Sequence, residues 1–317
     1  MIDYVYADIT SHYEQLRKNP LISFEDLVDI ETGEICPLRD NSGRIIRKRN
    51  GDPVYQKSVA KYKDLEIIVK PSGNVYLSGS LHKYYNIITK GINQNYNDFT
   101  YNDLIISLKK LSEELLLDLN DTELIRFEFG VNINTPFPAS EFLKNRVLEY
   151  KRKQATQLKT NFQNKYGHSS TGFLLEFKFT KFLIKFYAKG LQYGLNDNIL
   201  RFEINTLTKY LGPKIRINTI SDLFNKNILN ELGYKLIEDS GQVLIRDWLN
   251  EEILSESDQK LVRFFRDPVT RSNLHRQDRH LYKREKRKYI ELSQKYDTFT
   301  SKNLCQLISK KIRDLLV

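Results

Sequence analysis

The chain has 317 residues, of which 40% are hydrophobic, 28% charged and 12% aromatic, and this composition suits a folded globular protein rather than a disordered one. Lysine and arginine outnumber aspartate and glutamate by 50 to 40, and the resulting net charge of +10 favours a polyanionic partner. Cys36 and Cys305 are far apart and stand in no metal-binding spacing, which argues against a disulfide framework and a zinc site. No run approaches the ~18 apolar residues of a membrane span, so secretion and membrane insertion are not expected.

The first 70 residues are expected to form short strands joined by turns. YVYAD and LEIIVK have the composition of strands, and ETGE, DNSGR and RNGDP between them are turn sequences. The following run, VYLSGSLHKYY at 75–85, alternates between apolar and polar residues. This period of two predicts a half-buried strand, with Val75, Leu77 and Leu81 on the core face and Tyr76, Ser78, Ser80 and His82 on the open face.

The middle of the chain predicts helices and strands in turn. Apolar spacing predicts an amphipathic helix over 98–119, with Thr100 and Asp103 as capping residues, and a second helical stretch over about 138–160. LIRFEFGVNI at 124–133 is a predicted strand with Arg126, Glu128 and Asn132 on its outer face. GFLLEFKF, FLIKFYAKG and ILRFEINTL are the next predicted strands. In the last two, one face carries Lys185, Tyr187 and Lys189, and another carries Arg201, Glu203 and Asn205.

Helical spacing dominates after residue 211, although GQVLIRDWL at 241–249 fits a strand or a helix. A basic helix is predicted over 270–292, followed by an amphipathic helix with Leu304, Ile308, Ile312 and Leu315 at turn spacing. Strands come first and helices last, so we expect an α+β fold. It would consist of a mainly antiparallel sheet of two related halves with flanking helices, followed by a helical C-terminal region. We expect a catalytic domain over 1–215 and a helical, basic DNA-binding region over 216–317.

Reactive side chains are expected on the open faces of four strands. The triplet RFE occurs at 126–128 and at 201–203, each time after a polar strand, which resembles a weak internal duplication. If the two halves share one sheet, one cleft could collect His82, Glu128, Tyr187, Lys189 and Glu203. Two carboxylates and an imidazole suit a hard divalent cation such as Mg²⁺ or Mn²⁺. A tyrosine hydroxyl can attack phosphorus, and a lysine beside it can neutralise the developing charge.

Each of these features also has a purely structural interpretation. A single RFE triplet is usually a surface ion pair, a single histidine on a strand is usually a hydrogen-bonded one, and Tyr187 is one of 19 tyrosines. The combination on four strands is what favours a site.

At these residues the sequence resembles the replication-initiation endonucleases of filamentous phages and related phage and plasmid replication proteins. The matching stretches, which span about half of the chain, are VYLSGSLHKYYN, LIRFEFGVNIN, FLIKFYAKGLQY and ILRFEINTLTKYLGPKIRINTISDLF. The resemblance implies a cytoplasmic rolling-circle initiator in a bacterial host cell. Such an enzyme nicks one strand of a supercoiled duplex origin, stays attached through a tyrosine, and religates the displaced circle.

Carried over by position, the resemblance makes His82, Glu128 and Glu203 candidate ligands of Mg²⁺ or Mn²⁺, and Tyr187 with Lys189 the nucleophile region. Tyr193 is a rival nucleophile, and Tyr84 and Tyr85 are further alternatives. The His-hydrophobe-His motif of the better-known rolling-circle class does not occur, which leaves the ligand set open.

Basic residues predict where DNA binds. On one helix, Arg276, Arg279, Lys283 and Arg287 would stack along one side and suit a phosphate backbone. Arg284 on that helix, and Arg126, Lys185 and Arg201 on the strands, complete the candidate set. A solvated helix with a plain charge surplus is the alternative.

The expected partners are the supercoiled origin and its single-stranded product, with host helicase and polymerase as further candidates. Two other functions stay open. One is a non-catalytic DNA-binding regulator, and the other is a relaxase or transposase-like strand transferase.

Overall fold

The structure is a computed structural model, and the main chain separates into two compact units. Unit one comprises residues 1–129 and 206–229, and unit two comprises residues 130–205 and 230–317. The structure describes residues 1–25, 42, 44, 45, 47, 51, 53, 58–70, 72–163, 169–196, 198–213, 215–246, 249–296 and 301–317. Cys36, the ETGE turn, and most of the DNSGR and RNGDP turns lie outside these residues.

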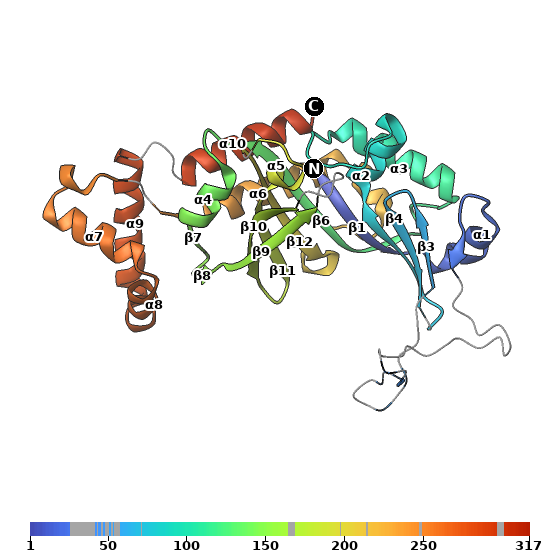
Figure 1. Cartoon of the computed structure of the whole chain (residues 1–317), viewed down its shortest axis with the longest axis horizontal. Coiled ribbons are helices and arrows are strands. Elements are labelled where there is room, and N and C mark those ends of the chain that lie inside the picture. Colours follow the sequence, from blue (N-terminus) through green and yellow to red (C-terminus); the bar gives the residue numbers. More distant parts are fainter. Residues whose placement is uncertain are drawn as a thin grey trace. The chain divides into compact units, whose positions relative to one another are not determined.

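Unit one is built on antiparallel strands in the order β2-β3-β4-β5-β1-β6. Its elements are β1 (Ile2–Asp8), α1 (Tyr13–Lys18), β2 (Phe24–Glu25), β3 (Ser58–Tyr62), β4 (Leu65–Val69), β5 (Val75–Ser80), α2 (Leu81–Lys90), α3 (Tyr101–Leu115) and the first part of β6 (Glu123–Asn134). Helices α2 and α3 pack against each other, and α2 packs on β1 (Figure 1). The strands predicted at 4–8, 65–70 and 124–133 are confirmed.

The amphipathic helix predicted over 98–119 is α3. Its core face buries Leu104, Leu108, Leu111 and Leu115 together with Ser107, whose hydroxyl donates to the carbonyl oxygen of Asp103. Thr100 and Asp103 form the predicted capping box, in which each side chain accepts a hydrogen bond from the backbone of the other residue.

The strand predicted over 75–85 is wrong in its second half. It ends at Ser80, and α2 begins at Leu81. The Ser80 hydroxyl accepts a hydrogen bond from the backbone amide of Lys83 and thereby caps the helix. The alternation of polar and apolar residues continues by chance into this helix, so His82 lies on a helix and is buried rather than on the open face of a strand.

Unit two contains a second group of strands, in the order β6-β12-β11-β10-β9, and a small sheet in the order β13-β7-β8. The described pairings β9–β10, β10–β11, β13–β7 and β7–β8 are antiparallel. The elements are α4 (Ala139–Asn145), β7 (Val147–Tyr150), β8 (Lys153–Gln154), β9 (Thr156–Gln163), β10 (Ser169–Lys178), β11 (Phe182–Ala188), α5 (Lys189–Gln192), β12 (Ile199–Leu207), α6 (Lys226–Gly241), β13 (Val243–Ile245), α7 (Glu256–Arg266), α8 (Pro268–Gln277), α9 (Arg279–Tyr296) and α10 (Ser301–Leu315). Strands β6 and β12 and helix α6 carry residues of both units.

Two helix predictions in this unit need correction. The helix expected over 138–160 ends at Asn145, and the β7–β8 hairpin and β9 follow it. The basic helix expected over 270–292 is two helices, α8 and α9, which meet at Asp278. The Asp278 carboxylate accepts hydrogen bonds from the backbone amides of His280 and Leu281, which starts a new helix there. GQVLIRDWL forms β13 over its Val243–Ile245 segment.

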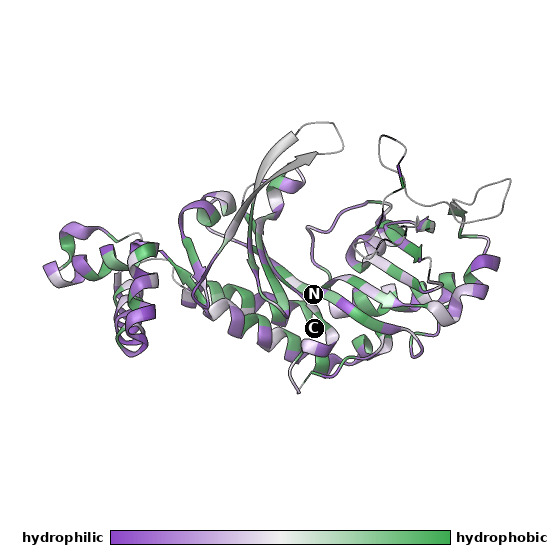
Figure 2. Cartoon of the chain, turned by 90° about the horizontal axis from the view of Figure 1, so that it is seen from below, coloured by the Kyte–Doolittle hydropathy of each residue, from purple (hydrophilic) through white to green (hydrophobic). Residues whose placement is uncertain are grey.

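The C-terminal helices share a core with β13. Their buried cluster consists of Leu244, Leu249, Leu254, Val262, Phe265, Tyr282 and Tyr289. Helices α7, α8 and α9 lie together in Figure 1, and hydrophilic residues dominate them in Figure 2. The amphipathic helix at the C-terminus is confirmed as α10, with Leu304, Ile308, Ile312 and Leu315 buried.

The predicted fold class is confirmed: the chain is α+β, with antiparallel strands, flanking helices and a helical C-terminal region. The two units do not follow the predicted division at residue 215, because residues 130–205 cluster with 230–317. The assignment of separate functions to 1–215 and 216–317 stays a prediction. In the part of the chain that the structure describes, no helix combines the length and apolarity needed to span a bilayer.

Candidate catalytic cluster

Five of the predicted site residues meet in unit two, on β11, α5 and β12. We call this group the Tyr187 cluster, and it comprises Lys185, Tyr187, Lys189, Arg201 and Glu203. Strands β11 and β12 are neighbours, so residues that are 16 positions apart in the chain come into contact. The side chains that alternate along one face of each strand, as the sequence predicts, are the ones that face each other.

Glu203 is the centre of the cluster. Its Oε2 atom lies 3.3 Å from the Tyr187 hydroxyl, which donates to it, and 2.5 Å from Nε of Arg201. Its Oε1 atom lies 3.2 Å from Nζ of Lys185. The side chains of Arg201 and Glu203 are each only 3% exposed, so water screens their attraction weakly. Glu203 is therefore a firmly held carboxylate that two cations balance.

Besides Glu203, Arg201 has a second partner, Asn132 of β6. The Asn132 side-chain oxygen accepts a hydrogen bond of 3.0 Å from Nη1 of Arg201, and Asn132 is itself buried. The sequence places Asn132 on the outer face of its strand but does not select it for the site. The sequence feature that could have identified Asn132 is its position, because it lies two residues from Gly130 on a strand that carries other candidate site residues.

The close approach of β6 to β12 depends on Gly130. A Cβ atom at this position would lie 2.4 Å from the carbonyl oxygen of Phe202 and 2.5 Å from Cβ of Glu203. Such distances are far inside van der Waals contact, so only glycine lets β12 hold Glu203 at this depth.

Lys189 is a buried lysine beside two phenol rings. It is 2% exposed, its Nζ atom donates to the Tyr187 hydroxyl at 3.5 Å, and it lies over the rings of Tyr187 and Tyr193 at 5.2 and 5.3 Å from their centroids. The sequence places Lys189 on the strand, whereas it is the first residue of α5. An ammonium group in this position attracts phosphate oxygens.

The rival tyrosines differ in accessibility. Tyr187 and Tyr193 are both partly exposed. Tyr84 is fully buried, its hydroxyl donates to Glu114 at 2.5 Å, and burial raises the pKa of this phenol far above its usual value. The hydrogen bond with Asp103 raises the pKa of Tyr85 to about 12. Tyr84 is therefore out of reach of a DNA phosphate, whereas Tyr85 is partly exposed and, like Tyr187, is hydrogen-bonded to a carboxylate, so it stays an alternative.

The three predicted metal ligands, His82, Glu128 and Glu203, do not all belong to the Tyr187 cluster. His82 is 2% exposed, its ring stacks on Phe99, and its Nε2 atom lies 3.1 Å from the side-chain oxygen of Asn97. It belongs to unit one, as does the half-buried Glu128, whereas Glu203 belongs to unit two. Over the residues described here, no three histidine, cysteine, aspartate or glutamate side chains are grouped in a way that could hold a metal ion. His82, Glu128 and Glu203 therefore form no such group among the described residues, and the metal ion and its ligands stay a prediction.

The eight predicted DNA-binding residues differ in exposure, and Lys185 is partly buried in its ion pair with Glu203. Arg126, Arg276, Arg279, Lys283, Arg284 and Arg287 are exposed. Arg201 is buried in its ion pair with Glu203, so its exposure does not support the prediction that it contacts DNA, which stays untested. Arg276 lies on α8, whereas α9 carries the other four predicted residues, Arg279, Lys283, Arg284 and Arg287. The predicted single row of basic residues is therefore interrupted at Asp278.

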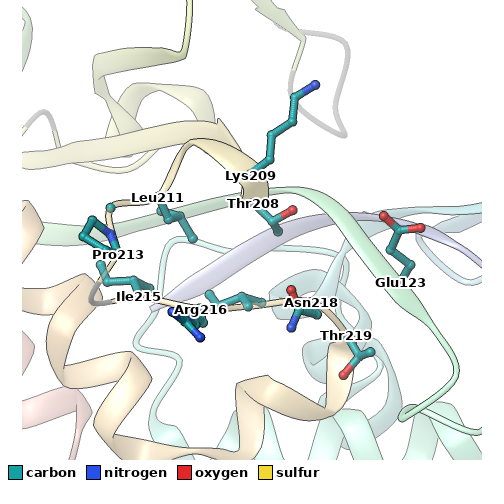
Figure 3. A pocket seen from close by; sticks show the side chains of 11 residues that line it. Glu123, Thr208, Lys209, Leu211, Pro213, Ile215, Arg216, Asn218 and Thr219 are labelled. Carbon is teal, nitrogen blue, oxygen red and sulfur yellow. The ribbon is translucent and has the colours of Figure 1, made fainter.

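A cavity of about 450 Å³ lies in unit one, against the loop 211–219. Its polar lining residues diverge: in Figure 3 the Lys209 side chain points away from Arg216, Asn218 and Thr219. A binding site for a charged ligand needs converging polar groups, so this cavity is a weaker candidate than the Tyr187 cluster.

Comparison of structures finds a distant neighbour. It is described as the structure of a rolling circle replication initiator protein from Geobacillus stearothermophilus. The two chains are 11% identical, the match covers 81% of this chain and 88% of that one, and the TM-score is 0.37. No family model matches the sequence, and no curated protein matches it.

Proposed function

We propose that this protein is a rolling-circle replication initiator that nicks one strand of origin DNA and holds the cut end on Tyr187. The observation that carries the proposal is the position of the Tyr187 hydroxyl, between a carboxylate at 3.3 Å and a lysine ammonium at 3.5 Å. A nucleophilic tyrosine needs a group that takes its proton and a cation that steadies the new charge, and Glu203 and Lys189 supply these two.

The reaction follows from this geometry. The Tyr187 proton moves along its hydrogen bond to Glu203 while the phenol oxygen attacks the phosphorus atom of the scissile phosphodiester. A bond forms between the Tyr187 oxygen and phosphorus, and the bond from phosphorus to one deoxyribose oxygen breaks. The leaving oxygen keeps the electron pair and takes up a proton from water. Lys189 neutralises the charge on the phosphate oxygens in the transition state.

Covalent attachment also explains how the break would be rejoined. The phosphotyrosine bond conserves the energy of the phosphodiester, so a free DNA hydroxyl can attack it and release Tyr187. Arg201 and Lys185 act indirectly. They fix the orientation of Glu203, and Glu203 in turn fixes the Tyr187 hydroxyl. Exposed arginines and lysines of α9 supply the basic surface for the duplex.

A divalent cation is the second part of the proposal. The sequence predicts Mg²⁺ or Mn²⁺, but the described candidate ligands do not assemble into a cation site, so no step above depends on one. A relaxase or transposase-like strand transferase would use the same chemistry on a different DNA. In both cases the partner is DNA, and a bacterial cytoplasm is the compartment in which this reaction would take place.

The test is a cleavage assay on supercoiled DNA that carries a stem-loop from near the coding region. We expect conversion to the open circle in the presence of Mg²⁺, with a protein–DNA adduct that survives denaturation by detergent. Binding without any nicking or adduct, in Mg²⁺ and in Mn²⁺, would reject the enzyme and leave the regulator function.

A further inference from the structure

A second polar cavity, of about 300 Å³, lies in unit two between the β7–β8 hairpin and helices α8 and α9. Its lining residues are Glu149, Arg152, Gln154, Pro268, Arg271, Ser272, His275 and Tyr282. None of them belongs to the Tyr187 cluster. Three of its side chains, from an element early in the unit and from two helices late in it, are buried polar groups: Glu149, Arg271 and Tyr282.

Glu149 is the only acidic residue in the lining of this cavity, and cations surround it. Its Oε1 atom accepts a hydrogen bond of 2.7 Å from the Tyr282 hydroxyl and lies 3.6 Å from Nζ of Lys286. Its Oε2 atom lies 3.5 Å from Nε of Arg271. Glu149 thus faces two cations, Arg271 and Lys286, and Arg152 adds a third positive charge. The sum of these charges is positive.

Arg271 lines this cavity and has a buried donor that makes no hydrogen bond within the described residues. The side chain is 3% exposed, and one of its terminal nitrogens donates to the carbonyl oxygen of Phe265. Its Nε atom is buried and makes no hydrogen bond within the described residues, although it is ion-paired with Glu149 at 3.5 Å. A buried guanidinium N–H without an acceptor is costly, and an oxygen atom entering the cavity would satisfy it.

Arg152 stands at the mouth of the cavity in an unusual backbone conformation. Lys151 and Arg152 form the two-residue turn of the β7–β8 hairpin and have φ values of +45° and +71°. Turns of this kind normally use Asn-Gly or Gly-Gly, because side chains disfavour positive φ. The Arg152 guanidinium is hydrogen-bonded to Nε2 of His275, so the turn holds a charged group against α8.

The electrostatic field at His275 agrees with this charge balance. Burial lowers the pKa of His275, and the positive charges of Arg152, Arg279 and Lys283 lower it further, whereas Glu149 acts in the opposite direction. Basic residues therefore outweigh the single carboxylate at the position of this ring.

We propose that this cavity is a phosphate-binding site, in which the Nε donor of Arg271, the guanidinium of Arg152 and the hydroxyl of Ser272 receive the phosphate oxygens. Arginine suits this task because its planar fork matches two oxygens of a phosphate. Glu149 repels an anion, but Lys286, Arg271 and Tyr282 already compensate its charge. The phosphate belongs either to a DNA strand or to a free nucleotide. Only the DNA source rests on the proposed function.

The experiment measures binding of inorganic phosphate and of thymidine monophosphate to the full chain by calorimetry. We expect Arg152→Gly to weaken both by roughly tenfold, because a hydrogen bond to a charged group is lost. Glycine adopts positive φ without strain, so the melting temperature should stay the same or rise, which separates lost binding from lost folding. Arg313→Ala is the control: this exposed arginine on α10 lies outside the lining, and its removal changes the net charge equally.

Competition identifies the source of the phosphate. Displacement of inorganic phosphate by a short oligothymidylate assigns the site to DNA, and displacement by thymidine monophosphate alone assigns it to a nucleotide. Absence of phosphate binding to the unaltered protein, or equal binding by Arg152→Gly, overturns the proposal. Tyr187→Phe should keep full phosphate binding. The phosphate site and the nicking function can therefore be rejected independently of each other.

Discussion

The hydroxyl of Tyr187 and the Oε2 atom of Glu203 lie 3.3 Å apart, and the same oxygen is 2.5 Å from Nε of Arg201. One carboxylate oxygen is thus shared between a phenol and a guanidinium. A change at Glu203 therefore acts on the candidate nucleophile and on a buried cation together, and experiments on the cluster need to separate these two effects.

Tyr187→Phe should abolish the covalent protein–DNA adduct while DNA binding persists, because the substitution removes only the hydroxyl. Tyr193→Phe is the matched control, since Tyr193 also lies beside Lys189. The measurement is the yield of detergent-stable adduct on supercoiled DNA. An adduct that persists in Tyr187→Phe and is lost in Tyr193→Phe would transfer the nucleophile to Tyr193.

Glu203→Gln should abolish nicking with DNA binding largely kept, and Glu128→Gln should do the same if Glu128 is a ligand of the predicted metal ion. For Glu203 the reason is that an amide accepts the Tyr187 proton far less readily than a carboxylate. Glu203→Gln should also lower the free energy of unfolding by about 3 kcal/mol, because Arg201 is left buried without its counter-charge. Glu128 is half-buried and should cost less stability.

Nicking rates and urea unfolding curves of both variants supply the check. Nicking by either variant at the rate of the unaltered protein rejects the role of that glutamate. Unchanged stability of Glu203→Gln would show that the ion pair with Arg201 contributes nothing net.

Nicking should require added Mg²⁺ or Mn²⁺ and stop after treatment with a chelator. The measurement is the nicking rate against metal concentration, with Ca²⁺ as an ion that binds oxygen ligands but supports phosphoryl transfer poorly. Full activity of a chelated sample would show that the protein's own cations, Lys189 first among them, supply the positive charge that the reaction needs.

Replacing Arg279, Lys283 and Arg287 on α9 by alanine should weaken DNA binding most at low salt, by about 1 kcal/mol or more per contact. These exposed residues recur every four positions on one helix. The slope of log affinity against log salt should fall by roughly 3 when three phosphate contacts are lost. Lys110→Ala on α3 is the control, and an unchanged slope would remove α9 from the DNA-binding surface.

Asp103 gives a prediction for the pH dependence of stability. Burial raises the pKa of this carboxyl, but hydrogen bonds with Tyr85 and with Thr100 outweigh burial, so the folded pKa is lowered. The stabilisation is therefore present above the unfolded pKa of about 3.9 and disappears as the pH falls through the folded value. Asp103→Asn should lower the free energy of unfolding by about 1 kcal/mol at neutral pH.

This difference between Asp103→Asn and the unaltered protein should shrink towards zero in acid. Urea unfolding across the acid range tests it. Glu113→Gln, at an exposed position on the same helix, should show no such loss with pH. A difference that stays constant in acid would mean that the capping geometry, rather than the charge, carries the effect.

The sequence by itself determined the local structure wherever periodicity and capping agree. The α3 capping box at Thr100, the alternation along β11 and β12, and the apolar face of α10 follow from residue spacing within one element. Spacing also placed Tyr187 and Glu203 on matching strand faces, because alternate residues of a strand share a face.

Only the tertiary structure decided which of these side chains meet. A single capping serine ends β5 and turns His82 into a buried helical residue, and a single aspartate divides the basic helix at Asp278. Burial of Arg201 and Glu149 depends on contacts between residues far apart in the chain. Periodicity reports the face of an element, but the partner of that face, and therefore the burial and charge balance of each group, is set by packing between elements.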